Sequence, residues 1–158
     1  MSAGVYLHIP FCKSRCSYCD FATDVYRDSA VVERYVDALC SEINAFGLNL
    51  AADTIYFGGG TPSLLTSSQI ENILKTVSSK FSIATDAEIT MEMNPATVTP
   101  ESLAAYRSLG VNRASFGVQT FDDRALKLLA RGHDAADARN TFALLREAGF
   151  ENVSFDLI

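Results

Sequence analysis

The chain has 158 residues, of which 48% are hydrophobic, and a formal net charge of −6. That length suits one domain or a large part of one, with enough apolar residues for a sizeable core. Acidic residues outnumber basic ones by 19 to 13, which disfavours nucleic-acid partners because proteins that bind them usually present a basic face. No apolar run approaches the ~20 residues of a membrane span. The first ten residues, MSAGVYLHIP, lack the pattern of a secretory signal, so we expect a cytoplasmic protein.

Short strand-like runs alternate with amphipathic helical segments along the chain. The five expected strands are residues 4–9, 54–59, 88–94, 113–119 and 152–158. The first helix is expected from apolar residues at helical spacing and from a glycine that would stop it: Val32, Val36, Leu39, Ile43, Phe46 and Gly47. Strands that alternate with helices predict a parallel sheet with right-handed crossovers. The alternative is an antiparallel sheet with one solvated face.

The later helices have start and stop signals of their own. The expected starts are a capping box of Thr66 and Gln69, the pair Thr99 and Pro100, and Asp122 ahead of a short helix. Gly110 is the expected stop of the helix that begins near Pro100. The last helix, 134–148, is expected to turn Phe142 and Leu145 inward and to end at Gly149.

The expected strands alternate polar and apolar side chains, unlike parallel strands that are covered on both faces. The polar residues that share one face of a strand are Tyr6 and His8; Thr90, Glu92 and Asn94; Ser115, Gly117 and Gln119; Ser154 and Asp156. Helices against the apolar side and a polar inner face predict an α/β fold, a partial (β/α) barrel of about five strands. Ligands of such folds bind at the C-terminal ends of the strands, where Cys12, residues 58–60, Glu92 and Gln119 fall.

Three cysteines lie within the segment HIPFCKSRCSYCDF, residues 8–21, at positions Cys12, Cys16 and Cys19. In a reducing compartment, cysteines this close indicate metal binding or catalysis rather than disulfides. A structural zinc site usually has four Cys or His ligands, and the remaining cysteine, Cys40, fits the apolar face of the first helix. A [4Fe–4S] cluster held by three thiolates leaves one iron open to a substrate or cofactor. The spacing favours this cluster and leaves zinc as the alternative.

Three further segments carry candidate site residues. YFGGGTPSLL, residues 56–65, places successive glycines at a strand end, which either form a tight turn or let the backbone approach a ligand. MEMNP, residues 91–95, puts Glu92 on the inner face, where the carboxylate needs a partner or solvent. In the segment 112–133, Gln119 ends a strand, Arg131 follows it, and His133 is expected at a helix boundary.

The pattern C-x3-C-x2-C after a first strand, with Tyr18 before the last cysteine, resembles the radical S-adenosylmethionine (SAM) superfamily. Together with the three segments above, from YLHIPFC to FDLI, it is similar to the oxygen-independent coproporphyrinogen III oxidase family over nearly the whole chain. The resemblance implies that the three cysteines ligate a [4Fe–4S] cluster. It also implies that SAM chelates the open iron, and that the reduced cluster cleaves SAM to a 5′-deoxyadenosyl radical.

The resemblance also implies which residues line the SAM site. They are Tyr6, Tyr18, Gly59, Gly60, Thr61, Glu92, Gln119, Arg131 and Asp156. Glu92 and Asp156 would suit ribose hydroxyls or a cationic centre, and Arg131 a carboxylate. Residues 1–158 would then form a radical SAM core domain. Because the chain stops inside its last expected strand and a closed barrel of this kind has eight, we expect the remaining strands and a C-terminal domain to be absent.

The residues after Cys19 distinguish two branches of the family. Coproporphyrinogen dehydrogenases carry a fourth cysteine two residues after the third, whereas here Asp20 and Phe21 follow. This departure resembles the heme chaperone branch, whose members hold a SAM-exchangeable cluster and bind heme for delivery to acceptor proteins. The resemblance therefore implies heme as ligand and heme-acceptor proteins as partners. The alternatives are oxidative decarboxylation of a porphyrinogen and another radical SAM reaction.

Overall fold

A curved parallel sheet of five strands runs through the computed structural model, which describes residues 2–46 and 49–158. Its strands, in spatial order, are β1 (Ala3–Ile9), β4 (Leu50–Gly59), β5 (Phe81–Met93), β6 (Arg113–Gln119) and β7 (Asn152–Leu157). Every neighbouring pair is parallel, so the predicted α/β class is confirmed and the antiparallel alternative is wrong. β4 and β5 both begin several residues earlier than expected.

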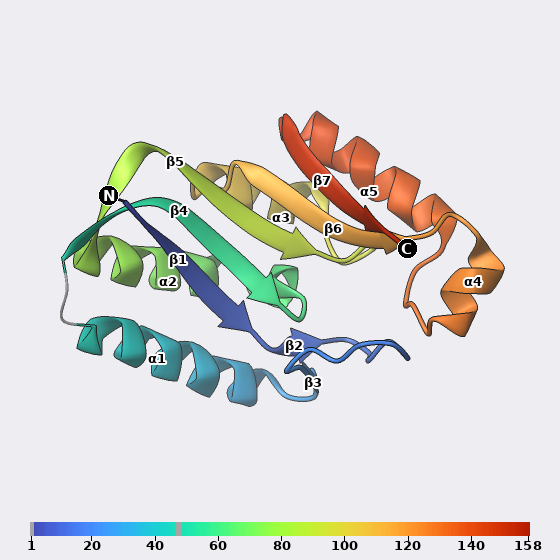
Figure 1. Cartoon of the computed structure of the whole chain (residues 1–158), viewed down its shortest axis with the longest axis horizontal. Helices are drawn as coiled ribbons and strands as arrows, with labels where there is room; N and C mark the ends of the chain where they lie inside the picture. The colour runs from blue at the N-terminus through green and yellow to red at the C-terminus, as the bar shows by residue number, and fades with distance from the viewer. Residues whose placement is uncertain (1, 47–48) are drawn as a thin grey trace.

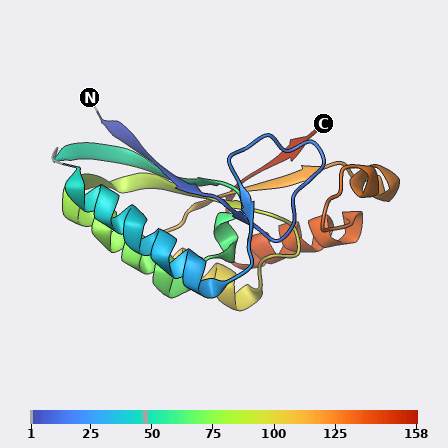
Figure 2. The same cartoon turned by 90° about the horizontal axis from the view of Figure 1, so that it is seen from below.

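The helices cover one face of this sheet and leave the other open (Figures 1 and 2). They are α1 (Ser29–Ala45), α2 (Ser67–Lys80), α3 (Pro100–Ser108) and α5 (Ala135–Glu147), with the short α4 (Asp123–Leu128) at one end and a 3-10 turn, η1 (Pro62–Leu64), after β4. The expected starts are confirmed: the Thr66–Gln69 capping box, the Thr99 cap before Pro100, and the Asp122 cap. The expected stop at Gly47 lies outside the described residues.

The core lies between the helices and the apolar face of the sheet. Its buried side chains include Leu7, Ile9, Phe57 and Met91 from the strands and Val36, Ile73, Leu103 and Leu145 from the helices. Cys40, on α1, belongs to the same cluster, as expected for a cysteine that acts as a small hydrophobe. Within the residues that the structure describes, no helix combines the length and the hydropathy needed to cross a membrane.

The open face of the sheet is polar, as the alternating strands predict. The guanidinium of Arg113 on β6 donates to the hydroxyl of Thr90 on β5 at 3.3 Å and to that of Ser154 on β7 at 3.0 Å. The Ser154 hydroxyl in turn donates to Ser115 at 3.1 Å. Hydrogen bonds therefore cross three strands on the face that no helix covers, so its polar groups are satisfied without a second layer.

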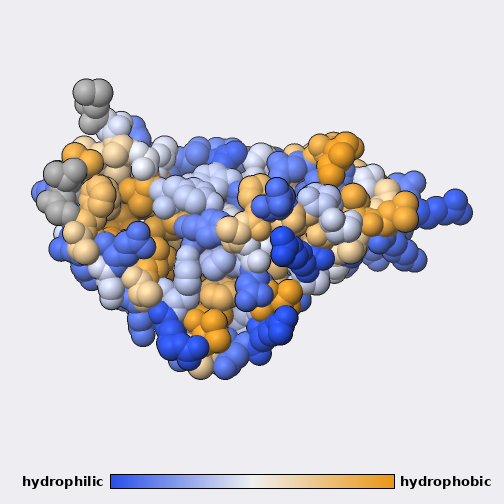
Figure 3. Space-filling view, turned by 60° about the horizontal axis from the view of Figure 1, so that its bottom comes forward, coloured by the Kyte–Doolittle hydropathy of each residue, from blue (hydrophilic) through white to orange (hydrophobic). Residues whose placement is uncertain are grey.

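Phe142, which was expected to face inward, and Phe46, which was expected in the repeat of the first helix, are both exposed. Phe142 on α5 is 37% exposed and lies under the Arg146 guanidinium, because the inward stripe of this helix runs through Thr141 and Leu145 and leaves Phe142 at its edge. Phe46, the cap residue after α1, stacks on Phe81 with ring centroids 5.5 Å apart. Figure 3 shows hydrophobic residues at the left end of the molecule, where Figure 1 shows the end of α1 and the start of β5.

Tyr106 ties α3 to the turn that follows β4. Its buried hydroxyl donates to the carbonyl oxygens of Ser63 at 3.1 Å and Leu65 at 3.2 Å, and burial raises its pKa to about 12. Tyr106→Phe is expected to lower the free energy of unfolding by about 1–3 kcal/mol, because it leaves two buried carbonyl groups without the hydroxyl that donates to them. Denaturant titration measures this change. The exposed control Tyr26→Phe should alter it by less than about 0.5 kcal/mol, and equal losses in the two variants would contradict the argument.

Candidate cofactor site

The three clustered cysteines lie on the loop of residues 10–28, here called the cysteine loop, between β1 and α1. A short parallel pair closes it, β2 (Phe11–Cys12) with β3 (Asp24–Val25). Two further backbone hydrogen bonds run from Asp24 N to Pro10 O at 2.7 Å and from Tyr26 N to Cys12 O at 2.6 Å. Figure 2 shows the loop rising on the side of the sheet away from the helices, so the cysteines face the open, polar side.

The end of α4 holds the far side of the cysteine loop. The backbone N–H of Ser17 donates to the carbonyl of Leu129 at 3.1 Å, and the Ser17 hydroxyl donates to the carbonyl of Leu128 at 3.1 Å. These carbonyls are left free by the helix C-terminus, so the loop satisfies them. The contact brings Arg131, which follows α4, against Cys16.

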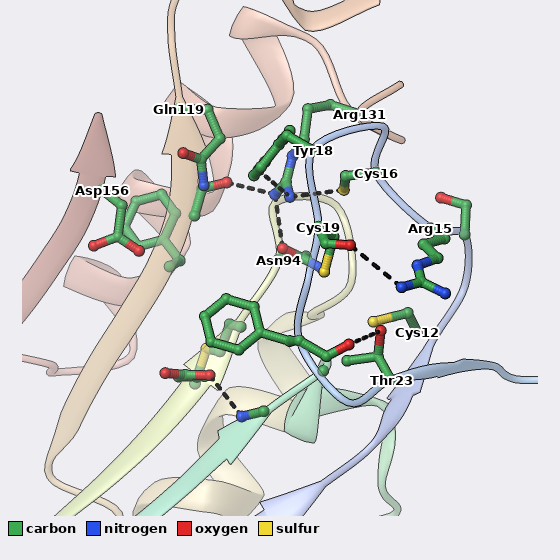
Figure 4. A pocket seen from close by; sticks show the side chains of 18 of the residues that line it. Cys12, Arg15, Cys16, Tyr18, Cys19, Thr23, Asn94, Gln119, Arg131 and Asp156 are labelled. Carbon is green, nitrogen blue, oxygen red and sulfur yellow. Dashed lines mark hydrogen bonds between the residues drawn. The ribbon is translucent and has the colours of Figure 1, made fainter. Parts of the chain in front are cut away.

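A cavity of about 180 Å³ lies between the cysteine loop and the C-terminal ends of β4 to β7 (Figure 4). The predicted site residues that line it are Cys12, Cys16, Tyr18, Cys19, Gly59, Gly60, Glu92, Gln119, Arg131 and Asp156. These residues come from six different segments of the chain, and the structure brings them together at the edge of the sheet where ligands of parallel α/β folds bind.

Two predicted residues, Tyr6 and Thr61, are not part of this lining. Tyr6 is 59% exposed on β1, with its ring stacked on Tyr56 at 6.0 Å between centroids and its hydroxyl 3.1 Å from His8 Nδ1. Thr61 is buried behind the cavity wall, where its hydroxyl donates to Cys12 Sγ at 3.7 Å. Thr61 therefore contacts a lining residue directly, whereas Tyr6 contacts Tyr56, whose hydroxyl donates to the lining residue Glu92.

The cysteine thiols provide a donor set that fits an iron–sulfur cluster. All three are free and partly exposed, and two of them accept hydrogen bonds, Cys12 from Thr61 and Cys16 from the Arg131 guanidinium at 3.2 Å. Hydrogen bonds to the ligating sulfurs are a feature of such clusters and help to set their reduction potential. Among residues 2–46 and 49–158, no three Cys, His, Asp or Glu side chains converge on one metal ion. Burial raises the pKa of the Cys12 thiol, so cluster binding there would release a proton.

Arg131 is the only cationic side chain held deep in this wall among the cavity residues described. Its Nη2 donates to Asn94 Oδ1 at 2.7 Å and to the Gly117 carbonyl at 2.6 Å, and its Nη1 reaches the hydroxyl of Tyr18 at 3.3 Å (Figure 4). In the described part of the chain, its buried Nε has no hydrogen-bond partner. A buried unsatisfied donor on a cation fits a site for an anionic group such as a carboxylate.

Glu92 is partnered rather than merely solvated. One carboxylate oxygen accepts from the Tyr56 hydroxyl at 2.6 Å and the other from the backbone N–H of Gly59 at 3.0 Å. Burial raises the pKa of Tyr56, and the neighbouring Glu92 raises it further, so the phenol stays a donor over the physiological range. The carboxylate is thus fixed at the cavity edge with a defined orientation.

Gly60, directly after β4, is required by packing against the end of β1 and the start of the cysteine loop. A Cβ on Gly60 would lie 2.6 Å from the carbonyl oxygen of Phe11 and 3.0 Å from that of Ile9. The N–H of Gly60 donates to Ile9 O at 2.8 Å, and the N–H of Thr61 to Phe11 O at 2.7 Å. In this segment the backbone of Gly60 closely approaches that of Ile9 and Phe11, and Gly59 and Gly60 line the cavity.

His133 lies at a helix boundary, as expected, one residue before the N-cap Asp134 of α5. It is buried, with Nε2 3.2 Å from the carbonyl oxygen of Val118, which requires the proton on that nitrogen. Burial, and then the positive charge of Arg131, lower its pKa from 6.5.

This lowered pKa makes stability depend on pH. Because the unfolded histidine binds a proton more readily than the folded one, the free energy of unfolding should fall as the pH drops below about 6.5. His133→Gln is expected to flatten this fall, as measured by denaturant titration at a series of pH values. Identical pH slopes for the variant and the wild type would contradict the assignment.

Asn94 is a site residue that the sequence did not single out. Its amide joins Thr61 to Arg131, donating from Nδ2 to Thr61 Oγ1 at 2.7 Å and accepting at Oδ1 from the arginine. The available signal was its place directly after β5, where it continues the alternating polar pattern two residues after Glu92, in the MEMNP segment. Many polar residues along the strands share this alternating pattern, so the pattern did not distinguish Asn94 from them.

Comparison with known proteins gives consistent results. A family model described as the radical SAM superfamily matches residues 6–158. The chain is 41% identical to the heme chaperone HemW of Synechocystis sp. and 35% identical to an oxygen-independent coproporphyrinogen III oxidase of Bradyrhizobium diazoefficiens. These matches cover 100% and 99% of the chain but only 40% and 36% of the relatives, so the chain spans well under half of their length.

A solved structure agrees with the family match. The coproporphyrinogen III oxidase HemN from Escherichia coli, described as a radical SAM enzyme, superposes with a TM-score of 0.90 at 32% identity, covering 98% of this chain and 36% of that one. The maturase HydG of Carboxydothermus hydrogenoformans, at 17% identity and a TM-score of 0.64, shares the fold alone. With a family model over nearly its whole length, a fold of this type and three free cysteines at the cavity, the chain belongs to the radical SAM superfamily.

Proposed function

We propose that the chain holds a [4Fe–4S] cluster and SAM and acts in a heme chaperone. The cluster would be held by Cys12, Cys16 and Cys19, which line one cavity and carry no fourth cysteine beside them. Membership of the radical SAM superfamily implies both cofactors. When bound, such a cluster supplies an electron to the sulfonium of SAM; the rest of the chemistry depends on how the protein positions the cofactor.

The cavity wall offers groups for each polar part of SAM. Arg131 would take the carboxylate, since its buried Nε is unpartnered in the described structure. The backbone edge at Gly59 and Gly60 would lie against the amino group. Glu92 and Asp156, both at strand ends, would accept from the ribose hydroxyls. Three further residues would complete the site: Tyr6, Tyr18 and Gln119, with Thr61 behind the cysteines.

Phe21 is the observation that carries the chaperone proposal over the oxidase alternative. It lies two residues after Cys19, it is 68% exposed, and it lines the cavity. Phenylalanine therefore stands where a coproporphyrinogen dehydrogenase would carry its additional cysteine. The similarity to proteins named heme chaperone HemW, from Synechocystis sp. and from other bacteria, supports the same choice. Heme would then be the ligand, and proteins that accept heme the partners.

An anaerobic comparison of two activities tests this proposal. Reconstituted protein is loaded with heme and mixed with an apo-acceptor, and heme transfer is followed by absorbance. In parallel, the same preparation is given coproporphyrinogen III, SAM and a reductant, and the porphyrin products are separated by chromatography. Heme transfer without decarboxylated product is the expected result. Conversion of coproporphyrinogen, or failure to bind and transfer heme, would overturn the chaperone assignment.

A further inference from the structure

We propose that Asn94 is a positioning residue that directs a hydrogen bond onto the Cys12 sulfur and thereby raises the reduction potential of the cluster. The proposal rests on the cluster assignment of the proposed function. It concerns one side chain at the C-terminal end of β5 and the two donors, from Thr61 and Arg131, that it connects to Cys12 and Cys16.

The contacts of Asn94 place it between two of the three cysteines (Figure 4). On one side, its Nδ2 lies 2.7 Å from Thr61 Oγ1, which lies 3.7 Å from Cys12 Sγ. On the other side, its Oδ1 lies 2.7 Å from Arg131 Nη2, and Nη1 of the same guanidinium lies 3.2 Å from Cys16 Sγ. One amide therefore joins the groups that donate to two cluster ligands.

The direction of these hydrogen bonds follows from the chemistry of the partners. An arginine can only donate, so the amide oxygen must face Arg131 and the amide NH2 must face Thr61. A threonine hydroxyl has one hydrogen. Because Thr61 Oγ1 accepts from the amide, its own hydrogen is left for the Cys12 sulfur. Thr61 is only 1% exposed, so water does not compete for that hydrogen.

An aspartate in place of Asn94 would reverse the hydrogen bond with Thr61 and keep the hydrogen bond from Arg131. Its carboxylate accepts and cannot donate, so the Thr61 hydroxyl would turn toward it and away from Cys12. Arg131 would still donate to the same oxygen position, and its second Nη2 contact, to the Gly117 carbonyl at 2.6 Å, would hold the guanidinium in place. Asn94→Asp thus separates the two arms of the network with almost no change in shape.

Hydrogen bonds to ligating sulfurs favour the reduced cluster, which carries more negative charge. Removing the bond to Cys12 should therefore make the midpoint potential more negative. Asn94→Asp also adds a charge, so two other variants isolate the bond. Thr61→Val removes the hydroxyl without adding charge, and Thr61→Ser keeps the hydroxyl. Asn72→Asp places the same new charge on exposed α2, away from the site.

The experiment is an anaerobic redox titration of the reconstituted wild type and variants without SAM, followed by electron paramagnetic resonance (EPR). At a fixed applied potential, the ratio of reduced to oxidised cluster should fall about tenfold in Thr61→Val, which for a one-electron couple is 59 mV. In Asn94→Asp, the ratio of reduced to oxidised cluster should fall by at least the same factor. Thr61→Ser and Asn72→Asp should titrate like the wild type.

The outcomes distinguish failure of this proposal from failure of the proposed function. If the wild type holds its cluster and Thr61→Val titrates unchanged, the proposal is wrong while the cluster assignment stands. If Asn94→Asp loses iron, an unchanged potential in Thr61→Val still overturns the proposal, because Asn94 is proposed to act through the Thr61 hydroxyl. A shift in Asn72→Asp equal to that in Asn94→Asp, with none in Thr61→Val, would overturn the positioning role. A wild type that binds no iron overturns the cofactor assignment and this proposal together.

Discussion

Cys16→Ala is expected to leave the protein without its iron–sulfur cluster. Cys16 is one of the three cysteines that line the cavity, and a cluster that already has one iron without a protein thiolate has no spare ligand to lose. After anaerobic reconstitution, the iron content should fall from about four per chain to near zero, together with the brown colour. Iron and sulfide analysis on the desalted protein measures this directly.

Cys40→Ala is the matched control, because it removes a cysteine from the core side of α1 rather than from the cavity. It is expected to keep full iron content and to cost about 1 kcal/mol of stability through the lost packing. Equal iron loss in the two cysteine variants would contradict the assignment of Cys16 as a ligand. So would retention of iron in Cys16→Ala.

Gly60→Ala should damage both stability and cluster binding. The new Cβ would stand 2.6 Å from the carbonyl oxygen of Phe11, and because that atom belongs to the backbone, β2 and Cys12 must move with it. Overpacking of this kind costs about 1–3 kcal/mol. We expect a lower denaturation midpoint and reduced iron occupancy, measured on the same preparation.

Gly132→Ala provides the comparison for this glycine. A Cβ at Gly132 meets Ser14 Oγ at 3.5 Å, an ordinary contact, so the free energy of unfolding should change by less than about 0.5 kcal/mol. Similar losses in the two variants would show that the cost comes from general sensitivity of this region and not from the backbone approach at Gly60.

The sequence predicted those parts of the fold that have local signals. Helix starts at Thr66, Thr99 and Asp122 were correct because a capping side chain bonds to backbone within three residues. The five strands were found from their alternating pattern. Phe142 was assigned wrongly because periodicity fixes a helical face only to within about one residue, and α5 packs through Thr141 and Leu145.

The parts of the site that the sequence did not predict depend on contacts between distant residues. Ser17 meets the end of α4 at a separation of 111 residues, and neither residue type marks such a contact. The pair β2–β3 is too short to have a period. Asn94 acts through partners at separations of 33 and 37 residues. Gly59, Glu92, Gln119 and Asp156 were found together because each lies at or near a strand end, where the topology of a parallel sheet collects them.

The cluster and its open iron can be tested most directly by metal analysis of anaerobically reconstituted protein, with EPR spectra of the reduced protein recorded before and after addition of SAM. We expect about four irons and four sulfides per chain, and a spectrum that changes when SAM binds. Stoichiometric zinc without iron, or an iron–sulfur spectrum that SAM leaves unchanged, would contradict the proposed cofactor site.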